Sequence, residues 1–91
     1  MTSYELISWL RGLLEAPLPG PDEEESWFLK AKPFLEQLND LDISPKFFEF
    51  IHHYVSDADI RRKDSTYRTN QDSELKTYLA EYESKTNITM E

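Results

Sequence analysis

The stretch that decides the fold is residues 43–60, which read I-S-P-K-F-F-E-F-I-H-H-Y-V-S-D-A-D-I. Ser44 near its start is an expected helix cap, and Pro45 suits the first helical position, where a backbone N–H has no partner in any case. Ile43 just before the cap and Phe48 four residues into the helix have the spacing of a hydrophobic staple. These signals predict a helix that is apolar on most sides and therefore surrounded by other elements.

The second part of the same stretch contains another helix start. We expect Ser56 to be its cap, because Asp59 stands three residues later at the capping-box position and Val55 and Ile60 repeat the staple spacing. Each cap contributes about 1 kcal/mol to helix stability. The sequence therefore predicts a buried helix over 44–55 that turns sharply into another helix, with the rest of the chain packed around it.

The chain opens with the pattern of an amphipathic helix over residues 3–16, for which Ser3 is the expected cap. Its apolar residues recur at helical spacing and are Leu6, Ile7, Leu10, Leu13 and Leu14. Gly12 inside this helix costs about 1 kcal/mol relative to Ala. Two interpretations remain open for it: another helix passes closely there, or it is a surface glycine. The helix is expected to end at a stiff connector that contains Pro17, Pro19, Gly20 and Pro21.

The W-L-R-G-L-L segment of this helix consists of Trp9, Leu10, Arg11, Gly12, Leu13 and Leu14. It resembles the opening helix of many short phage-encoded proteins of unassigned function. The resemblance covers residues 4–16 and carries no catalytic residue. It implies an origin in a phage or another mobile element.

Two further helical segments have an interrupted pattern. A second helix is predicted to begin near Pro21, and Pro33 is expected either to kink it or to divide it into two pieces. Residues 56–83 lose their apolar pattern in the middle, so they fit one long helix with a polar centre or two helices that meet between residues 65 and 70. We favour two helices. With no alternation of period two to indicate strands, the sequence predicts an all-α, single-domain bundle of four to five helices over residues 1–83 and a frayed tail over 84–91.

Composition limits the classes of function. The 91 residues carry a net charge of −8, which disfavours direct binding to nucleic acid or to an anionic membrane. The absence of cysteine excludes disulfides and thiolate chemistry. No segment has the pattern of a membrane span or a secretory signal, so we expect a cytoplasmic protein. The two Trp, five Tyr and five Phe are compatible with a compact monomer or with a homodimer that completes its core between subunits.

Catalytic and metal-binding patterns are weak. Glu49 and His52 form one E-x-x-H step, which carboxylate-bridged metal bundles use twice, and His53 is the remaining histidine of the chain. We expect one of these histidines to lie against the rim of the core and the other to face water. No nucleophile elbow or glycine-rich phosphate loop is present. We therefore expect no metal, no cofactor and no enzymatic activity.

Charge is unevenly distributed along the chain. Residues 1–60 hold twelve acidic and four basic residues, whereas residues 61–91 hold six of each. The first hypothesis is that an acidic face of the protein binds and inhibits a basic host protein, such as a nucleic-acid-binding or defence protein. The residues predicted for this face are Asp22, Glu23, Glu24, Glu25 and Trp27. The alternative to this face is that the carboxylates only match the dipole of a helix start and are otherwise solvated.

A basic cluster supports a second hypothesis. It would bind the phosphates of a nucleotide or cyclic nucleotide, with a tyrosine stacked on the base. Its members are Arg61, Arg62, Lys63, Tyr67 and Arg68. The competing interpretation is a helix face whose cations pair with Asp57, Asp59 and Asp64 at helical spacing.

Overall fold

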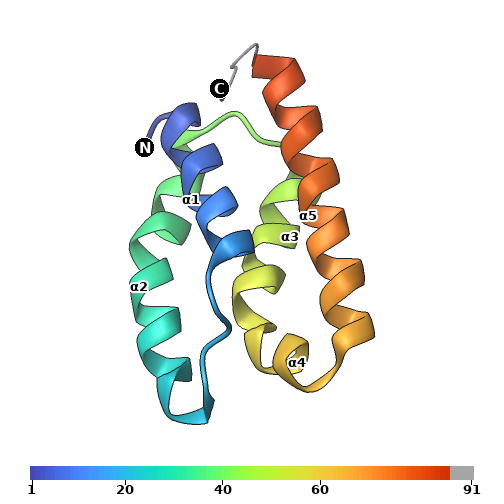
Figure 1. The fold of residues 1–91 in the computed structure, drawn as a ribbon. Helices are drawn as coiled ribbons and strands as arrows, with labels where there is room; N and C mark the ends of the chain where they lie inside the picture. The colour runs from blue at the N-terminus through green and yellow to red at the C-terminus, as the bar shows by residue number, and fades with distance from the viewer. Residues whose placement is uncertain (87–91) are drawn as a thin grey trace.

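The structure, a computed structural model, describes residues 1–86 and is all-α, as the sequence predicts. Its helices are α1 (Ser3–Glu15), α2 (Glu24–Gln37), α3 (Pro45–Ser56), α4 (Ala58–Lys63) and α5 (Ser65–Thr86), with short 3₁₀ turns η1 (Pro21–Glu23) and η2 (Leu38–Asp40). The four long helices run alternately down and up the bundle, and α4 lies at the end where α3 connects to α5 (Figure 1). Helix α3 packs against both α2 and α5, and α1 packs against α5.

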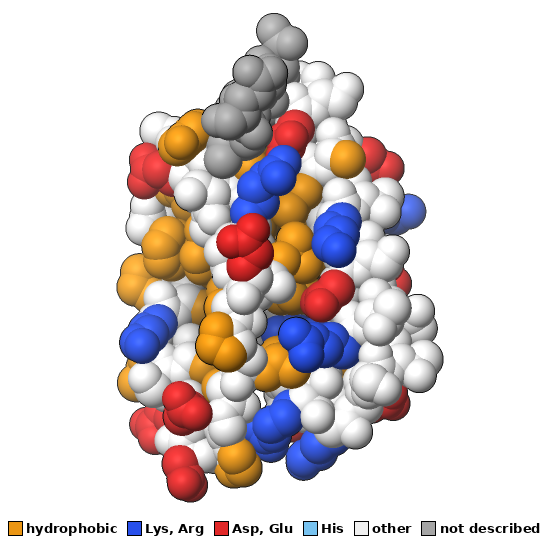
Figure 2. Space-filling model, viewed as in Figure 1, with side chains coloured by type: hydrophobic (Ala, Val, Ile, Leu, Met, Phe, Trp, Pro, Cys, Tyr) orange, Lys and Arg blue, Asp and Glu red, His pale blue; other side chains and the backbone are white. Residues whose placement is uncertain are grey.

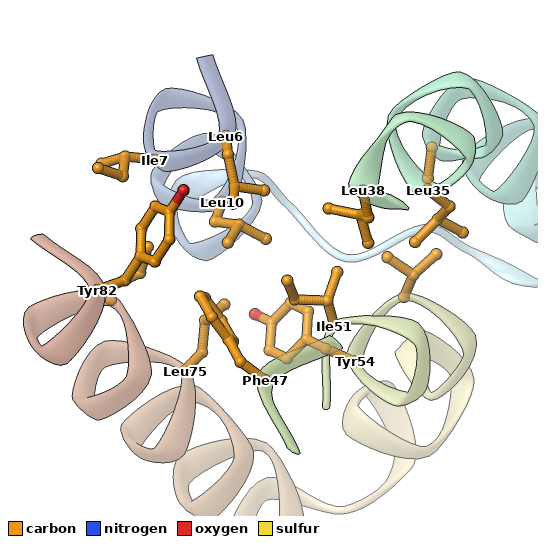
Figure 3. Close-up of a cluster of buried hydrophobic side chains, with 13 residues drawn as sticks. Leu6, Ile7, Leu10, Leu35, Leu38, Phe47, Ile51, Tyr54, Leu75 and Tyr82 are labelled. Atoms are coloured by element: carbon orange, nitrogen blue, oxygen red, sulfur yellow. The ribbon is translucent and has the colours of Figure 1, made fainter. Parts of the chain in front are cut away.

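The core forms where α1, α3 and α5 meet the C-terminal half of α2. Its buried apolar side chains are Leu6, Ile7, Leu10, Ala31, Leu35, Leu38, Phe47, Ile51, Tyr54, Val55, Leu75, Leu79 and Tyr82. The labelled side chains of this cluster converge from all four long helices (Figure 3). Phe47 stacks on Tyr78 with ring centroids 5.1 Å apart, and its other aromatic neighbour is Tyr82. The predicted central position of the 43–60 stretch is therefore confirmed for its α3 portion.

The start of α3 follows the predicted cap. The Ser44 hydroxyl accepts a hydrogen bond from the Phe47 backbone N–H at 3.2 Å, and Pro45 is the first residue of the helix. Ile43 and Phe48 are both half-buried against the core. These contacts fix the direction in which the chain enters its central helix.

The predicted cap of the next helix is wrong. Ser56 is the exposed last residue of α3, and Asp57 is the residue at which α3 ends and α4 begins. The Asp57 carboxylate does not cap α4, because it accepts hydrogen bonds from side chains of α5 instead. The second staple is also not formed: Val55 is buried, whereas Ile60 is 41% exposed.

The cap of α1 lies one residue earlier than predicted. The Thr2 hydroxyl accepts a hydrogen bond from the Glu5 N–H at 3.1 Å, and the Glu5 carboxylate accepts one from the Thr2 N–H at 3.3 Å. This reciprocal pair is a capping box, in which a Glu or Gln stands three positions after the cap. Ser3 shares a hydrogen bond with the Tyr82 hydroxyl at 2.8 Å instead.

The interrupted segments resolve as follows. Pro33 lies inside α2 without dividing it, and this helix ends at Gln37. Residues 56–83 contain two helices, as favoured, but they meet at Asp64, just before the predicted interval. The Asp64 carboxylate accepts a hydrogen bond from the Tyr67 N–H at 3.0 Å, which caps α5. Helix α5 continues to residue 86, so residues 84–86 of the predicted tail are helical, and residues 87–91 lie outside the described residues.

Gly12 is a surface glycine. Apart from the backbone of its own helix, a Cβ placed on it would meet no atom within 4 Å, so the surface interpretation holds and the close approach of another helix does not. We expect Gly12→Ala to raise the free energy of unfolding by about 0.4–1 kcal/mol, because Ala restricts the unfolded chain without a clash in the folded one. Urea denaturation followed by circular dichroism measures this change.

Gly20→Ala is the matched control for that substitution. A Cβ on Gly20 would lie 3.2 Å from a carboxylate oxygen of Glu23, so the gain there should be smaller. A loss of stability in Gly12→Ala would contradict the open surroundings of this residue.

Candidate functional site

The acidic run at the start of α2 divides into engaged and free carboxylates. Glu24 forms an ion pair with Arg62 at 2.8 Å, and Glu23 accepts a hydrogen bond from the Gly20 N–H at 3.2 Å. Asp22 and Glu25 are exposed and form no ion pair with any described residue. Two of the four predicted carboxylates are therefore available to a partner.

Trp27, the aromatic residue predicted for this face, contributes to the fold instead. Its indole N–H donates a hydrogen bond to the Val55 carbonyl at 3.0 Å, which connects α2 to the end of α3. The exposed apolar residues at the start of α2 are its neighbours Phe28 and Leu29, which are 44% and 56% exposed. Helical spacing gave a signal for Leu29 alone, because Phe28 lies three residues before Ala31 and seven before Leu35 and so shares the spacing of the buried side of α2.

We define the η1–α2 face as Asp22, Glu25, Phe28 and Leu29. Asp22, Glu25 and Leu29 line one shallow depression together with Ser26 and Lys30. Phe28 lines a second depression, whose other residues are Glu24, Trp27, Val55, Ser56, Ala58 and Asp59. Acidic side chains gather over the η1 turn and the start of α2, at the lower left of the molecule in Figure 2. The face thus combines exposed apolar side chains with free negative charge.

The most deeply buried member of the basic cluster is Arg61, which is 2% exposed. Its guanidinium carbon lies 3.8 Å from the centroid of the Tyr54 ring, and its Nη1 donates hydrogen bonds to the Tyr54 carbonyl and, at 2.7 Å, to the Gln71 side chain. Burial away from water lowers the pKa of the guanidinium from its usual value. Arg61 therefore connects α3, α4 and α5 and is not available to a ligand.

Two carboxylates bind the residues that lie around this buried cation. Asp57 accepts hydrogen bonds from the Tyr67 hydroxyl at 2.6 Å and from the Gln71 amide at 3.1 Å. Asp72 accepts a hydrogen bond from the Tyr54 hydroxyl at 2.7 Å. We call Arg61 and these five residues the Arg61 network. Its hydrogen bonds satisfy most of the polar groups buried there, which would be costly to bury unpaired, and the Arg61 Nε atom is left without a hydrogen-bond partner among residues 1–86.

The other cations of the cluster point in different directions. Arg62 donates to the Pro19 carbonyl at 2.9 Å in addition to its pair with Glu24, so it connects α4 to the chain before α2. Arg68 lies 3.8 Å from Asp72, and Lys63 is exposed. The ion pairs of the arginines are thus made with Glu24 and Asp72 and not with the three aspartates suggested by helical spacing. The structure does not bring the cluster together as one anion site.

The histidines lie as expected. His52 is half-buried beside Phe48, with ring centroids 4.7 Å apart, and His53 is exposed. The Nε2 atom of His52 is buried and has no hydrogen-bond partner within residues 1–86. The same residues contain no group of three side chains that would suit a metal ion.

Comparisons with known proteins give no relative: no family model matches the chain, and neither a curated protein nor a solved structure is significantly similar to it. The resemblance of the opening helix to phage-encoded proteins therefore stays a prediction. Of the helices described, none combines the length and the apolar character that crossing a membrane requires.

We expect Arg61→Ala to destabilise the fold strongly. The substitution leaves the Tyr54 carbonyl and the Gln71 amide oxygen buried without a donor, at about 1–3 kcal/mol for each group. Lys63→Ala, at an exposed residue two positions away, is the control and should change stability by less than about 0.5 kcal/mol. Urea denaturation measures both, and equal effects would contradict the structural role of Arg61.

Stability should also fall at alkaline pH. Burial and the hydrogen bond to Asp72 raise the pKa of Tyr54, and the hydrogen bond to Asp57 raises the pKa of Tyr67. The folded chain therefore retains these phenolic protons where the unfolded chain has lost them. This contribution to stability is fully present below about pH 10, the pKa of an unfolded tyrosine, and is lost as the pH rises further.

Urea denaturation at pH 8, 9.5 and about 11 measures this loss. Tyr54→Phe and Tyr67→Phe should each make the decline above about pH 10 less steep, whatever their effect on stability at neutral pH. A decline of unchanged slope in both variants would show that other groups cause it.

Proposed function

We propose that the protein is a small acidic interaction protein that binds a basic protein through the η1–α2 face and inhibits it by covering its basic surface. The observation that supports this function is the exposure of Phe28 and Leu29 beside the free carboxylates of Asp22 and Glu25. Large apolar side chains at the surface contribute binding energy when a partner removes them from water. The carboxylates of Asp22 and Glu25 favour a partner whose surface is basic.

The electrostatic argument concerns long-range attraction as well as contact. The chain carries a net charge of −8, and twelve of its acidic residues precede position 61. Such a field accelerates the approach of a basic protein, and local carboxylates then fix the orientation of the complex. A protein surface that binds nucleic acid fits as the target, because its Lys and Arg side chains pair with carboxylates as they pair with phosphates.

The nucleotide hypothesis stays a prediction that no contact in the structure favours. Arg61 is buried, and the hydroxyl of Tyr67 already donates to Asp57. Lys63 and Arg68 are both exposed, but phosphate binding at a built site needs several donors that converge. Thermal-shift measurements with nucleotides and cyclic dinucleotides test this alternative directly.

A synthetic helical peptide of alternating Lys and Leu pairs is a suitable probe for the η1–α2 face. We expect the protein to bind it, and Asp22→Lys/Glu25→Lys to weaken binding at least about tenfold, because two attractive contacts become repulsive. Leu29→Ser should weaken binding of the same peptide without changing its dependence on salt. Isothermal titration calorimetry at low and high salt measures both effects.

The control variant is Glu74→Lys/Glu81→Lys, which changes the net charge equally at two exposed residues of α5. It should retain most of the affinity. An equal loss in the two double variants would show that only net charge matters, and no binding of the Lys/Leu peptide by the unmodified protein would overturn the proposed function.

A further inference from the structure

A second surface lies between α1 and α5, on the side of the molecule that faces the viewer in Figures 1 and 2. Leu14, Leu79 and Ala80 provide its apolar part, and the charged side chains of Arg11, Glu15, Lys76 and Glu83 border it. Hydrophobic atoms are visible between charged groups over these two helices (Figure 2). This α1–α5 groove shares no residue with the η1–α2 face.

The charges along the groove are ordered by sign. Arg11 and Glu83 form an ion pair across it. Glu15 follows Arg11 by one turn on α1, and Lys76 precedes Glu83 by two turns on α5. Neither Glu15 nor Lys76 forms an ion pair with another described residue. The α1 side therefore carries one positive and one negative charge, and the α5 side carries the opposite charges in the corresponding order.

This order makes the surface complementary to itself. Helices α1 and α5 run in opposite directions side by side (Figure 1). A two-fold axis parallel to the groove would place α1 of one copy over α5 of the other at the same height. Glu15 of each copy would then face Lys76 of the other copy. Arg11 of each copy would face Glu83 of the other. Isologous contacts repeat each pair twice in this way.

We propose that the α1–α5 groove is a homodimer interface, with a second copy of this chain as its occupant. Opposite charges meet at every bordering position, and the short side chain of Ala80 permits close approach of the two helical layers. The removal of Leu14 and Ala80 from water supplies the attraction, and the reciprocal charge pairs set the register. This inference is independent of the proposed function, since its test involves no other protein.

Sedimentation equilibrium over a range of concentrations measures the association. The unmodified chain should show a mass that rises from 10.8 kDa towards twice that value. Glu15→Lys and Lys76→Glu should each weaken dimerisation at least about tenfold, because each places two pairs of like charges in contact. Glu74→Lys and Lys46→Glu change the net charge equally at exposed residues outside the groove and should leave the dimer intact.

Mixing the two single variants gives the sharpest test. A heterodimer of the Glu15→Lys and Lys76→Glu chains has opposite charges in both reciprocal pairs, so the mixture should associate more tightly than either variant alone. The double variant Glu15→Lys/Lys76→Glu should also dimerise. The mixture also excludes a competing explanation, an attraction between Glu15 and Lys76 within one chain. That attraction would be restored in the double variant but not in the mixture, where each chain carries like charges at the two positions.

Three results would overturn the proposal: a monomeric unmodified chain at millimolar concentration, a dimer that both single variants retain, or a mixture that fails to associate. Ala80→Gln provides a variant without a change of charge, at an exposed helical residue where Gln is well tolerated. It should weaken the dimer by obstructing the apolar part of the groove. Circular dichroism of each variant verifies that it is folded before its mass is interpreted.

Discussion

The buried guanidinium of Arg61 is the interaction on which the rest of the structure depends. It lies on the ring of Tyr54, binds a carbonyl near the end of α3 and binds Gln71 of α5. A cation removed from water is costly unless nearby groups compensate it, so its position restricts the positions of all its neighbours. The direction of α5 relative to α3 is set there, at the corner formed by α4, and α1 then packs on α5.

The two proposed surfaces follow from this arrangement. Arg62, next to Arg61 on α4, binds Glu24 and the Pro19 carbonyl, and Trp27 binds the end of α3. These contacts hold the start of α2 against the α3–α4 corner. They also place Phe28 beside that corner and leave Leu29 exposed on the surface of α2. The α1–α5 groove forms on another side, where α5 leaves the corner and runs beside α1.

Much of the fold was predictable because it depends on local and periodic signals. The apolar pattern gave the helix class, and Ser44 with Pro45 gave the start of α3. Prediction was wrong at Ser56 because the adjacent Asp57 and the distant Tyr67 and Gln71 decide that corner. A side-chain contact between segments that only the folded chain brings together leaves no local pattern. The hydrogen bond from Trp27 to Val55 is another contact of this kind, so the sequence did not show that the Trp27 indole is committed to the fold.

The chemical difference between arginine and lysine accounts for the charge pattern of the surface. Each arginine has a partner within the fold: Arg11, Arg62 and Arg68 pair with carboxylates, and Arg61 is buried. Every lysine is exposed and forms no ion pair with residues 1–86. The planar guanidinium offers several directed donors with weaker hydration, so it suits the interior, whereas the ammonium group is better solvated. A basic cluster composed mainly of arginine is therefore a weak indication of a ligand site in so small a protein. An approaching protein instead meets the carboxylates that have no arginine partner.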